Sequence, residues 1–137
     1  MVIVQMFATI TTRSIDSLEQ ELLSWQAEKA RASFQQLPLI RQLDQTQVWL
    51  ADGCKNMAAW ISSRLDLPQR IARDLLYVAR AHHQLVEEWL ETGEIGLERA
   101  VALIRLHRTS ASPELMEASR GIDLGGLWRL VASRERL

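Results

Sequence analysis

The sequence predicts an all-α protein, a bundle of about six or seven helices with an embedded helix-turn-helix. Apolar residues recur at helical spacing along the chain, the strict alternation typical of strands is absent, and only three prolines interrupt 137 residues. A composition of 47% apolar and 24% charged side chains is typical of a globular domain with a packed core. We therefore expect one helical domain over residues 14–137, preceded by a flexible N-terminal tail over residues 1–13.

The first predicted helix begins near Ser14 or Ser17, because serine caps the free amide groups of a first helical turn. It carries two apolar stripes on different sides, and a helix that is apolar on two sides is usually packed between partners. One stripe consists of Leu18, Leu22 and Trp25, and the other of Leu23, Ala27, Ala30 and Phe34. Pro38 predicts a kink or a break, followed by a second helix over about residues 39–50.

Turn signals separate the remaining helices. Asp52-Gly53 predicts a turn, Asp66-Leu67-Pro68 ends a helix, and Gly93 is expected to stop another because glycine adopts the left-handed conformation without steric cost. Ser112-Pro113 predicts a helix start, with serine as the cap. The expected helices cover about residues 56–65, 69–82, 97–106 and 127–134, and a further helix starts at about residue 113. The sequence leaves open whether the helix over residues 69–82 continues to residue 90.

Charge is segregated along the chain, although the net charge is only −1. Residues 55–83 carry five lysines and arginines against two aspartates, whereas residues 84–98 carry five glutamates and no base. The near-neutral total excludes a uniformly basic nucleic-acid-binding protein, but it is compatible with a local basic face. Because acidic residues repel phosphate, the stretch over residues 84–98 favours a protein contact.

Two predicted helices are joined by a tight turn at residues 66–68, which is the arrangement of a DNA-binding helix-turn-helix. On the second helix, a narrow arc predicts the buried face, and it contains Ile71, Leu75, Val78 and His82. The opposite side of this helix carries long polar side chains, mainly arginine and glutamine. Because arginine can form hydrogen bonds with guanine and glutamine with adenine, this side predicts contact with double-stranded DNA. The predicted DNA-binding residues are Gln69, Arg70, Arg73, Tyr77 and Arg80. The periodicity alone favours an ordinary solvated helix face over DNA contact, because every surface helix has a polar side.

Motifs in the middle of the chain resemble a known family. Asp52-Gly53, then Ala58-Ala59-Trp60, then a short turn and an arginine-bearing helix, then Gly93-Glu94-Ile95 stand in the order typical of the domain of unknown function 222 family, a bacterial repeat family. The resemblance covers roughly residues 15–137 and is most specific over residues 51–104. It implies a helical module of the kind that stands before an HNH endonuclease domain.

A more distant resemblance points to the same segment. It is similar to the helix-turn-helix of ParB-type chromosome-partition proteins, in which an arginine-bearing helix is followed by a helix that packs behind it. The resemblance implies that Gln69, Arg70 and Arg73 face DNA. Pro68 stands where such proteins usually have a capping serine or threonine, and proline donates no hydrogen bond to a phosphate.

No catalytic, metal or cofactor site is predicted. An HNH nuclease needs histidines that hold a divalent cation, whereas the adjacent His82 and His83 point about 100° apart on a helix, and His107 has no metal-binding partner at a suitable spacing. The single cysteine, Cys54, fits a reducing compartment, and no apolar run is long enough for a membrane helix. We therefore expect a cytoplasmic protein that is not an enzyme, with no cofactor, membrane or small-molecule substrate.

The sequence leaves three hypotheses open. The first is a DNA-binding accessory module that resembles the N-terminal part of an HNH endonuclease and lacks the nuclease site. The second is a homo-oligomerisation or protein-interaction module without DNA contact, in which the long first helix pairs with another copy or with a nuclease subunit. The third is a truncated remnant of a larger nuclease.

Overall fold

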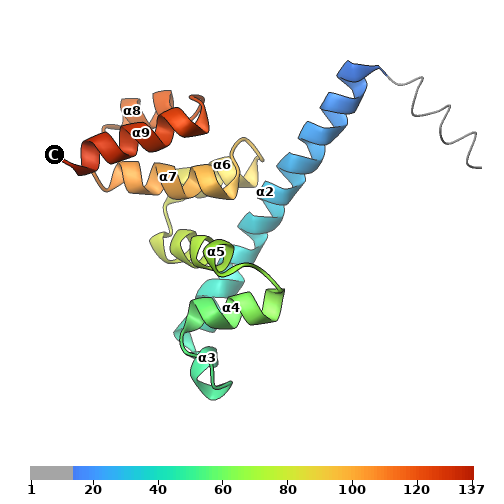
Figure 1. Ribbon diagram of the computed structural model, residues 1–137, viewed down its shortest axis with the longest axis vertical. Helices are drawn as coiled ribbons and strands as arrows, with labels where there is room; N and C mark the ends of the chain where they lie inside the picture. Colours follow the sequence, from blue (N-terminus) through green and yellow to red (C-terminus); the bar gives the residue numbers. More distant parts are fainter. Residues whose placement is uncertain (1–13) are drawn as a thin grey trace, which may run out of the picture.

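The computed structural model describes residues 14–137, so the tail predicted over residues 1–13 lies outside the described part of the chain. Within that part the only regular elements are eight helices, which confirms the all-α prediction (Figure 1). They are α2 (Ile15–Gln45), α3 (Val48–Ala51), α4 (Met57–Leu65), α5 (Gln69–Ala81), α6 (Gln84–Glu91), α7 (Leu97–His107), α8 (Pro113–Ser119) and α9 (Leu124–Glu135).

Helix α2 runs without interruption for 31 residues, so the break predicted at Pro38 is wrong. The helix begins where expected, because the Ser14 hydroxyl accepts a hydrogen bond from the Ser17 N–H at 3.1 Å. Pro38 removes one backbone hydrogen bond on the exposed side of the helix. Leu37 and Ile40 are both buried in the core, and their packing outweighs that loss. Residues 39–45 complete α2 instead of starting a second helix.

The helix predicted from residue 69 ends at Ala81 and does not extend to residue 90. His82 adopts a left-handed conformation with φ of 47°, and His83 then caps α6. The His83 Nδ1 accepts a hydrogen bond from the Val86 N–H at 3.3 Å, which places a polar acceptor at the start of the new helix. Two histidines thus separate α5 from α6 without a glycine or proline.

The core lies around α7, in which six of eleven residues are buried. This helix packs against α5 on one side and α9 on the other, as Figure 1 shows, and it also contacts α6 and α8. Ile61, Leu75, Val78 and Ile104 are among the buried residues of the core. Ile71, predicted on the buried side of its helix, is only half-buried, and Leu65 lies exposed at the end of α4.

Residues of the motifs on which the family resemblance rests stabilise the fold. The Asp52 carboxylate accepts hydrogen bonds from the Trp60 indole N–H and from the Arg64 guanidinium, both at 2.7 Å, and so joins the turn after α3 to α4. Gly93 has a φ of +81°, and a Cβ there would lie 2.8 Å from the Ala27 Cβ. Glycine therefore lets the turn after α6 lie directly against α2.

The N-terminal part of α2 projects away from the rest of the protein (Figure 1). Every residue from 15 to 26 is exposed, and we call this segment the α2 arm. The arm carries large apolar side chains, among them Leu22 and Trp25. None of the helices formed by residues 14–137 combines the length and the apolar character that crossing a membrane requires.

Candidate nucleic-acid interface

The five predicted DNA-binding residues lie on one side of α5, which we call the α5 face. Gln69, Arg70, Arg73 and Arg80 are exposed, whereas Tyr77 is half-buried. The residues buried on the other side of the helix are Ala72, Leu75, Leu76, Val78 and Ala79. Leu75 and Val78 are buried as the period-3.6 spacing predicted, whereas Ile71 is only half-buried and His82 is exposed beyond the end of the helix.

A tight turn sets α5 relative to α4. Asp66 adopts a left-handed conformation with φ of 53°, and α5 begins three residues later at Gln69. The Ser62 hydroxyl donates a hydrogen bond to the Leu67 carbonyl at 2.6 Å, and the Leu67 N–H donates to the Ser62 carbonyl at 3.1 Å. These bonds close the turn, so the bend expected at residues 66–68 is present.

Two of the three arginines on the α5 face have carboxylate neighbours. Arg80 donates two hydrogen bonds of 2.9 Å to Asp44 at the end of α2. These hydrogen bonds lower the pKa of the Asp44 carboxyl and raise the pKa of Arg80. Arg70 lies 3.7 Å from a Glu98 carboxylate oxygen, at the long end of ion-pair distance. In the part of the chain that the structure describes, no carboxylate lies within ion-pair distance of Arg73.

Arg108, the residue that caps the end of α7, joins the α5 face from another element. Its guanidinium carbon lies 4.7 Å from the centre of the Tyr77 ring, in a cation–π arrangement. The Tyr77 hydroxyl is buried and has no hydrogen-bond partner among the described residues. Arg108 therefore covers one face of the Tyr77 ring, and that face is not free to stack on a base.

Two neighbouring hollows connect these side chains. Arg73, Tyr77, Arg80 and Arg108 line the first hollow, of about 400 Å³. A second hollow of about 410 Å³ shares Arg73, Tyr77 and Arg108 and extends to Arg105. Arg105 itself donates hydrogen bonds of 2.6 and 3.1 Å to Glu135. Arg73 and Arg108 thus stand between the two hollows, and neither has an ion pair within residues 14–137.

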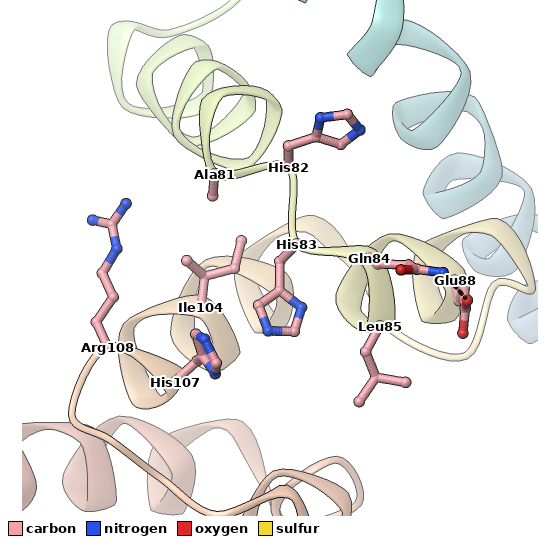
Figure 2. Close-up of a pocket in the computed structure, with 9 residues that line it drawn as sticks. All are labelled: Ala81, His82, His83, Gln84, Leu85, Glu88, Ile104, His107 and Arg108. Carbon is pink, nitrogen blue, oxygen red and sulfur yellow. Dashed lines mark hydrogen bonds between the residues drawn. The ribbon is translucent and has the colours of Figure 1, made fainter.

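A third hollow, of about 500 Å³, lies between the end of α5, the start of α6 and the end of α7. Figure 2 shows Arg108 at one side of it and the rings of His83 and His107 turned toward each other, while His82 points away. The two rings meet edge to face, with centroids 4.5 Å apart. Burial, together with the nearby His107, lowers the pKa of His83.

In the described part of the chain, no group of three or more histidine, cysteine, aspartate or glutamate side chains is placed so that it could hold a metal ion. His83 uses its Nδ1 to cap α6, and its ring packs against that of His107. These two contacts give His83 and His107 a structural role beside the third hollow. Arg108 is the strongly basic side chain that this hollow shares with the other two.

The acidic stretch over residues 84–98 is in part used inside the fold. Glu87 is 7% exposed, and both of its carboxylate oxygens lie 3.3 Å from Arg41 guanidinium nitrogens. Glu94 pairs with Arg120 at 2.9 Å. The stretch therefore holds α6 and the following turn to their neighbours, and it is not one continuous free acidic surface.

Sequence reasoning identified the α5 face but missed Arg108, Asp44 and the turn-closing Ser62. Arg108 offered only its charge as a signal, because nothing in its spacing connects it with Tyr77. Comparisons of the chain with protein-family models, with curated proteins and with solved structures found no match. The resemblances to the domain of unknown function 222 family and to ParB-type proteins therefore stay predictions from motifs.

Proposed function

We propose that the chain is a DNA-binding module in which the α5 face and Arg108 contact the duplex, and we assign it no catalytic role. Protein–DNA affinity rests largely on cationic side chains that neutralise phosphates. The observation that carries the proposal is that Arg73 and Arg108 line the same two hollows and that neither guanidinium forms an ion pair in the described structure. The carboxylates of Asp74 and Glu135 also line the second hollow, but neither lies within ion-pair distance of these two arginines. A guanidinium group without an ion pair can bind a phosphate without first breaking a contact inside the protein.

The remaining residues of the α5 face have different roles in this proposal. Gln69 and Arg70 stand at the start of α5, where a recognition helix usually meets base edges in the major groove. Arg80 is held by Asp44, so it fixes α5 on α2 and contributes less to DNA contact. Pro68 precedes the helix and lacks an N–H group, so the contacts to phosphate fall to side chains.

The salt dependence of binding to a fluorescently labelled duplex tests the proposal. Arg73→Gln and Arg108→Gln each remove one phosphate contact, so each should lower the slope of log affinity against log salt by about 0.9. Arg129→Gln is the matched control, because it removes the same charge from an exposed position on α9 that lines none of the three hollows. The control should bind like the original protein.

Two results would count against the proposal. If Arg129→Gln weakened binding as much as Arg73→Gln, the attraction would be a general charge effect and the α5 face would have no special role. If the original protein failed to bind duplex DNA even at low salt, where phosphate contacts are strongest, the proposed function would be wrong.

A further inference from the structure

The α2 arm presents a stripe of large apolar side chains to solvent. Ile15 is 83% exposed, Leu22 71%, Trp25 63% and Leu18 41%. Their positions are three, four and three residues apart, which is the a and d spacing of a coiled coil. The pattern continues at Lys29 and Ala32, and we call these six positions the α2 seam.

The α2 seam is not the side of the helix that packs on the core. Ala30 and Leu37 are buried, and Phe34 packs against the same core, whereas Lys29 and Ala32 are exposed. At about 100° per residue, the two sides lie roughly a third of a turn apart around the helix. A second helix could therefore lie along the seam while α2 keeps all its contacts with α5 and α6. Apolar patches of this kind in soluble proteins mark interaction sites.

We infer that two copies of this chain pair through their α2 seams in an antiparallel coiled coil. This interface is distinct from the proposed DNA contact. In the register centred between residues 23 and 24, Leu22 faces Trp25 of the second copy, Leu18 faces Lys29, and Ile15 faces Ala32. At each end of the seam the large Ile15 thus meets the small Ala32 of the other copy. The alkyl stem of Lys29 covers Leu18 of the second copy while its ammonium group stays in water.

The charge along α2 favours a second copy in the antiparallel orientation, although Arg31 is ion-paired with Glu28 of its own chain and the basic excess rests on Lys29. Residues 15–24 carry three carboxylates and no base, whereas residues 28–32 carry Lys29 and Arg31 against Glu28. Antiparallel pairing places the acidic end of one copy beside the more basic end of the other. Parallel pairing would place like charges side by side, and it would also align the two helix dipoles in the same direction. The overlap over residues 15–32 extends for about 27 Å, or five helical turns.

Light scattering and sedimentation of the full chain over about a hundredfold dilution test the pairing, because dimerisation depends on concentration. The original protein should form a dimer that dissociates on dilution. Leu22→Lys removes from each copy a leucine that the dimer would bury, so we expect the dissociation constant to rise by roughly a hundredfold or more. Leu50→Lys is the matched control, because Leu50 is 62% exposed on α3 and lies outside the seam.

A full chain that remains monomeric at every concentration would overturn the inference. Equal weakening of the dimer by Leu22→Lys and Leu50→Lys would overturn it as well. Circular dichroism of both variants shows whether they keep the helical fold, which is expected because both side chains are exposed. DNA binding by Leu22→Lys keeps the two proposals distinguishable. If the monomeric variant still binds duplex DNA, the DNA contact does not depend on the pairing, so either proposal can fail without the other.

Cysteine cross-linking tests the orientation. In a Cys54→Ser background, Leu18→Cys and Lys29→Cys proteins are mixed and oxidised. Antiparallel pairing predicts disulfides between residue 18 of one copy and residue 29 of the other. The two residue-18 positions would then lie about 16 Å apart along the axis, beyond the ~7 Å between Cα atoms that a disulfide can span. Predominant disulfides between two copies of Leu18→Cys would refute the antiparallel register.

Discussion

Gly93 is the position where a single methyl group tests the packing of α2 most directly. The residue has a φ of +81°, and a Cβ built there would lie 2.8 Å from the Ala27 Cβ, 3.1 Å from the Ala27 carbonyl oxygen and 3.2 Å from its Cα. Two of these three atoms belong to the backbone of a long helix. They cannot give way unless α2 and the turn after α6 move apart.

The expected loss in the free energy of unfolding for Gly93→Ala has two parts. The left-handed backbone costs an alanine about 1–2 kcal/mol. Overpacking against atoms that cannot relax adds about 1–3 kcal/mol, for a total of roughly 2–5 kcal/mol. Gly53 supplies the control, because its φ is +73° but nothing lies within 4 Å of the Cβ built there. Gly53→Ala should therefore show the backbone cost alone.

Urea unfolding followed by tryptophan fluorescence measures both variants under the same conditions. We expect Gly93→Ala to lose about 1–3 kcal/mol more than Gly53→Ala, since the backbone cost largely cancels in the comparison. Adding Ala27→Gly to Gly93→Ala should restore only part of the loss, because the backbone oxygen at 3.1 Å remains. Equal losses at Gly93 and Gly53 would refute the close contact between α2 and the turn after α6.

Two further predictions concern the buried Glu87 carboxylate with its partner Arg41 and the half-buried His83. Arg41→Met leaves the Glu87 carboxylate buried without its partner and should cost about 3–5 kcal/mol, whereas adding Glu87→Gln should recover much of it in the same unfolding assay. A double variant as unstable as the single one would contradict this. Burial and His107 lower the pKa of His83 against the opposing effect of Glu87. Below a pH of about 6.5, the ordinary pKa of histidine, the unfolded chain takes up a proton on His83 more readily than the folded protein does. The free energy of unfolding therefore keeps the full contribution of neutral His83 above that pH and loses it as the pH falls below it. His83→Asn keeps a capping side chain and should flatten this part of the stability profile, and an unchanged profile would exclude His83 as its source.

Local chemistry determines many of the helix boundaries, and those boundaries could be predicted. Ser14, Asn56 and Ser112 each accept a hydrogen bond from an amide three residues later, which is what a capping side chain in a sequence signals. Pro38 shows the limit of this reasoning. Its local preference for a break is outweighed by the burial of Leu37 and Ile40, and that burial depends on helices far along the chain.

The α5 face was predictable because the spacing along one helix determines which side chains share a side. The partners of that face were not predictable, because they come from other helices. Arg80 meets Asp44 across 36 residues, and Tyr77 meets a cation at the end of α7. The same limit applies to the break at His82, where His83 replaces the usual serine or aspartate as the cap of α6.

The continuity of α2 through Pro38 connects the two proposals physically. The same helix carries the α2 seam at its start and Asp44 at its end, where Asp44 holds Arg80 on α5. A break at Pro38 would separate the arm from the α5 face by a flexible joint. An unbroken helix instead fixes the distance between the seam and the α5 face. Two chains paired through the seam would then present their α5 faces at one defined separation, which is the property that a symmetric reader of spaced DNA half-sites requires.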